Sequence, residues 1–282
     1  MKRSNCSLYR RYTPQPPLGA FVACLWYSEG LQGTHERERL LPNGESGIVF
    51  DLREGSSQPR PNSDCFDGLC DQASYFDAVF CGARTDSFLL DTSKQERVIG
   101  IQFRPGGAYP FLGMPASEAA NATYSLADLW PRETPLIREA LLEAPTVDAK
   151  FAVLEAALLA RFRPESISHP AVAYAVNHLG GRFQNIRVGD VADRAGLSSR
   201  RLIDLFREQT GLTPKAFHRV RRFQHVLQAL RARSVENWAA LASYTGYFDQ
   251  AHFIHDFRRF SGMTPGEYLI AATPHLNHVP LK

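Results

Sequence analysis

Two stretches of this sequence, 51 residues apart, place hydrogen-bonding side chains on one face of a predicted helix. In the first, Leu202 and Phe206 lie four residues apart and mark the inward face, so Arg200 lies on the outer face. The same spacing recurs in the second stretch, where we expect Gln250, at the start of the helix, to be exposed as well. Arginine can donate two hydrogen bonds to guanine, and glutamine can pair in the same way with adenine. The chemistry that these side chains offer is the recognition of base edges.

Each of these two helices, called the reading helices, is followed by the same signal to stop and restart. The segments TGLTPKAF and SGMTPGEY share a glycine, a threonine and a proline in the same order. Gly211 and Gly262 can adopt the left-handed conformation that ends a helix. Thr213 and Thr264 can cap the next helix, with proline at its first position, and Glu267 completes a capping box in the second copy.

The repeat also extends upstream, which predicts two helix-turn-helix units. Gly196 and Gly246 mark the two turns at an offset of 50 residues, so one extra residue lies just after the second turn. Between the units, residues 214–232 read as one continuous helix, roughly 27 Å long from Pro214 to Arg231 at about 1.5 Å per residue. Such a helix could hold two reading helices in successive major grooves, about 34 Å apart.

Charge is divided unevenly along the chain. Residues 1–169 hold 17 Lys and Arg against 21 Asp and Glu, whereas residues 170–282 hold 15 against 8. A basic part joined to an acidic one suggests that the C-terminal part meets a polyanion, although an arginine-rich helical domain would give the same balance. The 282 residues suit two globular domains.

The N-terminal part has the pattern of antiparallel β structure. Short β-branched and aromatic runs, such as SGIVFDLRE and RVIGIQF, are separated by joints rich in Gly, Pro, Asn and Ser. From Pro135, apolar residues recur at helical spacing, which predicts amphipathic helices that cover the β structure or also pair two subunits. We therefore predict an α+β protein with an antiparallel β sandwich or barrel and its flanking helices in residues 1–163, a linker in 164–170, an all-α domain in 171–270 and a loose tail in 271–282.

The tandem units, the connecting helix and above all GYFDQAHFIHDFRRFSGMTPGEY (246–268) resemble the DNA-binding domain of the AraC/XylS family of bacterial transcription regulators. In the N-terminal part, YTPQPPLGAFVACLWY, LLPNGESGIVFDL and VIGIQFRPGGAYPFLG are similar to the cupin-like sensing domain that many such regulators carry. The resemblance implies a cupin-like antiparallel β-barrel followed by the two helix-turn-helix units. It also implies a regulator that binds specific DNA sequences, responds to a small molecule or a partner, and contacts RNA polymerase.

The resemblance also assigns groove-facing positions. Those that would read bases are Arg200, Ile203, Asp204, Gln250, Ala251, His252, Ile254 and His255. Candidates for phosphate contact, which holds register without reading sequence, are Ser199, Arg201, Arg207, Arg221, Arg222, Arg258 and Arg259, with Arg187 and Arg219 as further members.

Ile203 and Ile254 either touch thymine methyl groups or pack against the connecting helix. Asp204 either accepts from cytosine or orients Arg200, Arg201 or Arg207. Trp238 and Tyr244 are expected in the core.

An effector pocket is the expected feature of the N-terminal barrel, because a small barrel can enclose one small ligand. Its candidate side chains are Trp26, Tyr27, Arg84, Phe103 and Arg104. Arg84 would face an anionic group and Trp26 would form an apolar wall. Alternatively, these residues are ordinary core and surface, and the barrel only oligomerises or docks a partner.

Little in the sequence favours an enzyme, so we expect no catalytic residue, metal or cofactor. A cupin-type metal site needs two or three histidines, and residues 1–168 contain only His35, which leaves a cupin-type enzyme as a remote alternative. The five cysteines form no Cys-x-x-Cys pair, which favours reduced thiols over a redox or metal sensor at Cys65, Cys70 and Cys81. No apolar run suits a signal peptide or a membrane span, so a cytoplasmic protein is expected.

Overall fold

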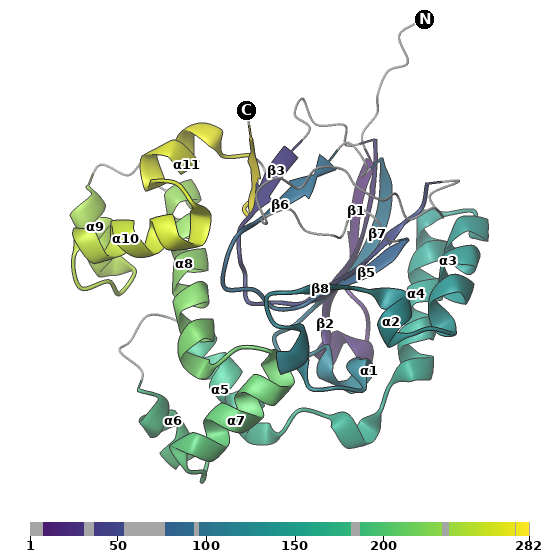
Figure 1. The fold of residues 1–282 in the computed structure, drawn as a ribbon, viewed down its shortest axis with the longest axis horizontal. Coiled ribbons are helices and arrows are strands. Elements are labelled where there is room, and N and C mark those ends of the chain that lie inside the picture. The colour runs from purple at the N-terminus through teal and green to yellow at the C-terminus, as the bar shows by residue number, and fades with distance from the viewer. Residues whose placement is uncertain are drawn as a thin grey trace, which may run out of the picture.

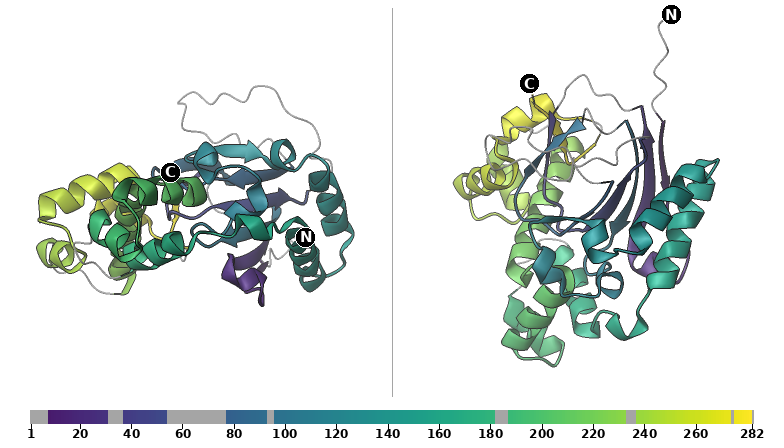
Figure 2. Two further views of the ribbon diagram at one scale, coloured as in Figure 1. Left: turned by 90° about the horizontal axis from the view of Figure 1, so that it is seen from below. Right: turned by 45° about the vertical axis from the view of Figure 1, so that its right-hand side comes forward.

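A β-rich N-terminal part and a helical C-terminal part lie side by side in the computed structural model (Figure 1). The structure describes residues 8–30, 37–53, 77–92, 96–181, 187–232, 237–273 and 275–281. The helical part lies on one side of the sheets, and helices α3 (Glu133–Glu143) and α4 (Val147–Arg161) lie on the other (Figures 1 and 2). The predicted α+β architecture of two domains is confirmed.

The larger sheet has six antiparallel strands in the order β1-β2-β7-β4-β5-β8. Their bounds are β1 (Leu8–Tyr12), β2 (Val22–Glu29), β4 (Gly47–Asp51), β5 (Ala78–Cys81), β7 (Arg97–Phe103) and β8 (Thr123–Ser125). Alternate residues of the central strands, such as Tyr27 and Ile99, point into one apolar core. On the opposite face Trp26 lies over Gly100, where an added Cβ would overlap the indole ring.

Helices seal the apolar face of this sheet. Leu141 of α3 and Leu154 and Leu158 of α4 are buried in the same core as the inward residues of β2, β4 and β7. Trp130, at the end of the short helix α2 (Leu126–Leu129), is also buried there. The helices predicted after Pro135 therefore cover the sheet, as the spacing of their apolar residues indicates.

A second sheet of three strands joins segments from both ends of the sequence. Its order is β6 (Phe88–Asp91), β3 (Arg37–Leu40) and β9 (His278–Pro280). Because β6 and β9 occupy both edges of β3, the described strands form two sheets rather than the predicted closed barrel. The segment predicted as a loose tail supplies β9, and Val279 is buried in the core of the second helix-turn-helix unit.

Seven helices follow the 3-10 turn η5 (Pro164–Ser166) in the described chain. They are α5 (Pro170–Gly180), α6 (Val188–Arg194), α7 (Ser199–Thr210), α8 (Pro214–Ala232), α9 (Trp238–Tyr244), α10 (Gln250–Ser261) and α11 (Pro265–Ala271). The observed α8 matches the predicted connecting helix. It carries α6 and α7 near one end and α9, α10 and α11 near the other (Figure 1).

Candidate nucleic-acid interface

Two equivalent helix pairs, α6–α7 and α9–α10, form the candidate interface. The turns contain Gly196 and Gly246, with φ of 68° and 76°, a conformation that favours glycine. The side chains of Ser198 and Asp249 cap α7 and α10 by accepting from the backbone N–H three residues on. The predicted capping box at Thr264 is present at the start of α11.

The inward faces of the reading helices α7 and α10 are as predicted. Leu202 and Phe206 of α7 are fully buried in one core, and Phe253 and Phe257 of α10 are fully buried in another. The opposite faces are therefore presented to solvent by two separately anchored helices.

Most of the predicted base-reading residues lie on these outer faces. Those that are exposed are Arg200, Ile203, Asp204, Gln250, Ala251, His252 and His255. Ile254 is half-buried and packs against the core of the second unit, whereas its repeat equivalent Ile203 is 37% exposed. In the described chain, no ion pair joins Asp204 to Arg200, Arg201 or Arg207, so the predicted orienting role of Asp204 has no contact to support it.

The predicted phosphate contacts divide into two groups. Ser199, Arg201, Arg207, Arg258 and Arg259 are exposed along the reading helices. Arg222 instead turns inward, because its Nη2 donates to Asp256 Oδ2 at 3.1 Å and its guanidinium lies 4.1 Å from the centre of the Tyr247 ring. Arg219 donates to the other oxygen of Asp256 at 2.6 Å. These contacts connect α8 to α10 and leave the side chains of Arg219 and Arg222 only 27% and 13% exposed.

Arg221 is also placed differently from the prediction. Its Nη1 lies 3.5 Å from Glu45 Oε1 and 3.5 Å from the carbonyl oxygen of Asn43, both in the N-terminal domain. Burial raises the pKa of Glu45, and the charge of Arg221 partly opposes that rise. Arg221 therefore takes part in the contact between the domains.

Phe248 is an exposed residue outside the predicted interface. It is the extra residue after the second turn, and its side chain is 92% exposed beside the start of α10. The preceding Tyr247 is buried against Phe253, with ring centres 5.5 Å apart, and burial raises the pKa of its hydroxyl to about 12. The extra residue in the second copy of the repeat was the sequence signal that could have identified Phe248.

Tyr244, predicted in the core, is exposed, whereas Trp238 packs against the core of the second unit.

The five predicted effector residues do not converge on one pocket. Tyr27 and Phe103 are buried in the main core, whereas Trp26 points to the other face of β2. Arg84 donates to the Asn121 carbonyl oxygen and to Thr123 Oγ1, and Arg104 donates to the Gly19 carbonyl oxygen. Because alternate residues of a strand face opposite sides of its sheet, Trp26 and Tyr27 cannot line the same side of β2.

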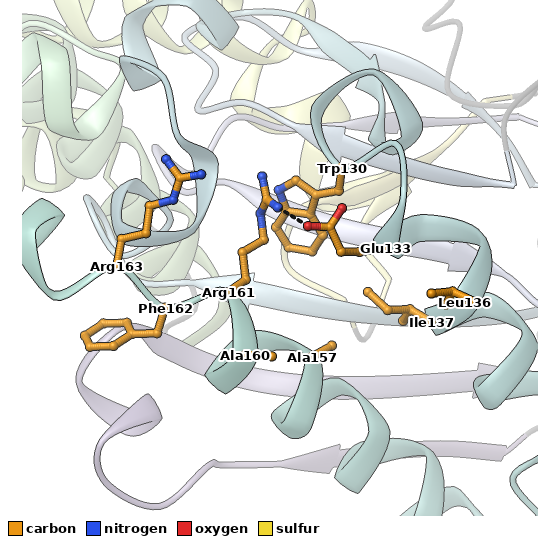
Figure 3. Close-up of a pocket in the computed structure, with 9 residues that line it drawn as sticks. All are labelled: Trp130, Glu133, Leu136, Ile137, Ala157, Ala160, Arg161, Phe162 and Arg163. Atoms are coloured by element: carbon orange, nitrogen blue, oxygen red, sulfur yellow. Dashed lines mark hydrogen bonds and ion pairs between the residues drawn. The ribbon is translucent and has the colours of Figure 1, made fainter.

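The structure instead contains a pocket of about 430 Å³ between α3 and α4 (Figure 3). Apolar side chains and two arginines line it: Trp130, Leu136, Ile137, Ala157, Ala160, Phe162, Arg161 and Arg163, together with Glu133. Arg161 pairs with Glu133 at 2.5 Å and its guanidinium lies 4.7 Å from the centre of the Trp130 ring. The charge of Arg161 is thus already matched within the pocket wall.

Other predictions concern metals, thiols and membranes. His35, Cys65 and Cys70 lie outside the described residues, and Cys81 is half-buried in β5. Within the described ranges, no group of three or more His, Cys, Asp or Glu side chains is arranged to hold a metal ion. Among the helices that the structure describes, none has the length and apolar character needed to cross a membrane.

Two families match separate parts of the chain. Residues 191–270 match the family described as a helix-turn-helix domain, and residues 10–125 match one described as a domain of unknown function, DUF6597. The first match covers both reading helices and α8.

Solved structures of several proteins are similar to this chain. A probable AraC family transcriptional regulator from Rhodopseudomonas palustris is 27% identical over 38% of this chain and 100% of its own, with a TM-score of 0.34. An AraC-type regulator from Chromobacterium violaceum is 23% identical over 38% of this chain and 96% of its own, with a TM-score of 0.35. ToxT from Vibrio cholerae, bound to an unsaturated fatty acid, is 10% identical over 88% of this chain and 90% of its own, with a TM-score of 0.40.

Proposed function

We propose that this chain, a DNA-binding transcription regulator of the AraC/XylS type, reads two successive major grooves of its target with α7 and α10. The observation that carries the proposal is the pair of equivalent helices near the two ends of α8, each with a buried inner face and an exposed polar outer face. Recognition helices of this kind contact base edges with residues near their N-termini. Arg200 and Gln250 occupy those positions in α7 and α10.

Each exposed side chain suits one kind of contact. Arg200 would pair with guanine and Gln250 with adenine, and His252 and His255 would donate to base acceptors or phosphates. Asp204 would accept from the amino group of cytosine, and Ala251 is small enough to meet a thymine methyl group. The phosphate contacts that hold the register would come from Ser199, Arg201, Arg207, Arg258 and Arg259.

We expect Arg200→Ala and Gln250→Ala each to relax the preference at one base pair. The loss of a bidentate contact should cost about 1–3 kcal/mol of discrimination at that position. Selection of sites from random duplexes, followed by binding to single-base variants of the selected site, measures this directly. Arg132→Ala, which changes an exposed arginine beside α3, is the control. Unchanged base preferences in both reading-helix variants would contradict the assignment.

Apolar side chains would add contacts with thymine methyl groups. Ile203 and Phe248 are exposed next to the polar reading residues, and phenylalanine is among the side chains that meet thymine in this way. Ile254 packs against the core of the second unit, so its location favours a packing role over contact with a thymine methyl group.

Replacing a contacted thymine with uracil should weaken wild-type binding by about 0.8 kcal/mol, or roughly fourfold, because one methyl group loses its burial. Ile203→Ala and Phe248→Ala should each abolish the loss of affinity that uracil causes at one position of the duplex. Ile254→Ala is the matched control and should keep the wild-type sensitivities. Affinities for duplexes with one thymine replaced at a time provide the measurement. Wild-type sensitivities in Ile203→Ala and Phe248→Ala would refute these contacts.

The N-terminal domain would control DNA binding through a small molecule or a protein partner in the cytoplasm, with RNA polymerase as a further partner. The α3–α4 pocket supports a ligand-binding role because apolar side chains line it and Arg163 lies in its wall. A second candidate role is the pairing of two copies, which the exposed Leu136 and Leu159 on α3 and α4 support.

Thermal unfolding with a panel of metabolites, together with sedimentation of the free protein, separates these roles. A ligand that binds only the folded state should stabilise it by about 2.7 kcal/mol at a hundredfold excess over its Kd. A pairing role instead predicts a dimer that Leu136→Glu converts to monomer, whereas the control Ile167→Glu, in the segment before α5, leaves it intact. No stabilisation by any metabolite, with a dimer present, would favour pairing over sensing.

A further inference from the structure

The last turn of α10 is held by the N-terminal domain. Arg39 of β3 donates from Nη1 to the carbonyl oxygen of Ser261 at 3.1 Å. The next residue, Gly262, ends the helix with φ of 70°, and a Cβ there would overlap the Arg39 guanidinium. A positive charge at a helix C-terminus also interacts favourably with the helix dipole. The end of the second reading helix is therefore fixed to β3.

The last turn of α7 is held by the same domain, close to the repeat equivalent of the α10 contact. Tyr109 of the short helix α1 (Tyr109–Leu112) donates its hydroxyl to Glu208 Oε1 at 2.7 Å. Gly211, the repeat partner of Gly262, lies so close to η4 (Ala116–Ala119) that an added Cβ would be 3.1 Å from the Ala116 carbonyl oxygen. Burial and the bond to Glu208 together raise the pKa of Tyr109 to about 12.

Between these two contacts, the segment that follows β3 runs along α8. Gln224 donates to the Pro42 carbonyl oxygen at 2.7 Å, and Arg221 lies 3.5 Å from Glu45 Oε1. A Cβ at Gly44 would lie 3.3 Å from the Phe217 ring, so the segment packs closely on the helix. The connecting helix is thus attached to the N-terminal domain near its middle as well.

The attachments to α7 and α8 leave the larger sheet at one end of three neighbouring strands, and the segment before β4 joins that end to β3, which carries Arg39. Gly47, where β4 begins, pairs with Cys81 near the end of β5 and with Gln102 near the end of β7. The α8-contacting segment leads into β4, and Tyr109 lies shortly after β7. Ala83, two residues after β5, is buried in the core of the first helix-turn-helix unit. One end of three hydrogen-bonded strands therefore connects the support of α7 to the segment that leads back to Arg39, the support of α10.

We propose that the N-terminal domain fixes the separation and angle of α7 and α10, and so sets the spacing between the two half-sites that the chain accepts. Arg39 is the positioning residue for α10, and Tyr109 is the positioning residue for α7. This inference rests on the proposed function of the two helices. It adds that spacing is set by contacts outside the helix-turn-helix domain, at the C-terminal ends of the reading helices, far from the base-reading residues at their starts.

The prediction concerns spacing rather than overall affinity. One inserted base pair moves the second half-site by about 3.4 Å along the duplex and rotates it by about 34°. Two helices held by one N-terminal domain at fixed positions cannot follow that change together. A chain in which α10 is released from β3 can follow it by a small movement of the second unit about α8.

The test uses the full chain and a duplex selected by it, together with duplexes that gain or lose one or two base pairs between the half-sites. A one-base-pair insertion should lower the affinity of the wild-type chain by about tenfold or more, which is the effect of one mismatched base pair. The same insertion should lower the affinity of Arg39→Ala by about threefold or less. Tyr109→Phe, which loses only a hydroxyl, should flatten the profile in the same direction. Arg10→Ala removes an exposed ion pair with Asp148 in the same domain and should keep the wild-type profile.

The outcomes separate the inference from the proposed function. Spacing profiles of Arg39→Ala and Tyr109→Phe that parallel the wild-type profile would overturn the inference and leave DNA reading intact. A wild-type chain that selects no two-part site would overturn both. Circular dichroism establishes whether each variant folds. If Arg39→Ala does not fold, the spacing profile of Tyr109→Phe decides the outcome.

Discussion

Asp256→Ala should lower the free energy of unfolding by about 3–5 kcal/mol, because it leaves two arginines near the interior without their partner. Asp256 is 1% exposed and accepts from Arg219 at 2.6 Å and from Arg222 at 3.1 Å. Both arginines belong to α8 and Asp256 belongs to α10, so the change also loosens the second reading helix. Denaturant unfolding followed by circular dichroism measures the loss.

Asp148→Ala is the matched control for this prediction. Asp148 also pairs with an arginine, Arg10 at 2.9 Å, but its side chain is 71% exposed. An exposed pair of this kind contributes about 0–1 kcal/mol. Equal losses in Asp256→Ala and Asp148→Ala would show that burial does not distinguish the two carboxylates.

Phe257→Ala should destabilise the second helix-turn-helix unit by about 3–5 kcal/mol, because it removes a fully buried ring and leaves a cavity. Its ring centre lies 5.3 Å from that of Phe223 and 5.8 Å from that of Tyr268, so three helices lose a shared contact. We expect weaker DNA binding to accompany the loss of stability, since the inner face of α10 is what fixes its outer face. Chemical unfolding and binding to the selected duplex measure the two effects.

Phe248→Ala provides the corresponding control, because its ring lies in the same unit but is almost fully exposed. Surface substitutions of this kind usually change stability by no more than about 0.5 kcal/mol. Phe248→Ala should therefore unfold like the wild type. If Phe257→Ala were as stable as Phe248→Ala, the contact of Phe257 with Phe223 and Tyr268 would not be part of the core of this unit.

Local signals in the sequence predicted the helical domain well, because helix ends depend on a few neighbouring residues. Gly211 and Gly262 end α7 and α10 in the left-handed conformation, and Thr264 forms its capping box, as their residue types require. Helical periodicity also separated the buried Leu202 and Phe206 from the exposed Arg200. These inferences needed no information about the rest of the chain.

Contacts between distant segments could not be predicted in this way. Arg221 and Arg222 lie on α8, which has the two helix-turn-helix units and the N-terminal domain around it, so periodicity gave no outer face to identify. The pairing of β9 with β3 joins residues more than 200 positions apart, and a three-residue strand has no pattern of its own. The same limit applies to the predicted effector residues, whose strand faces depended on an architecture that local patterns had not specified.

The pairing of β9 with β3 also has a consequence for synthesis of the protein on the ribosome. β3 is made early, but its partner at residues 278–280 emerges roughly 10–50 s later at typical translation rates of about 5–20 residues per second. During that interval one edge of β3 has unpaired backbone groups, which can pair with a strand from another nascent chain. The smaller sheet reaches its final form only after both α7 and α10 have been translated.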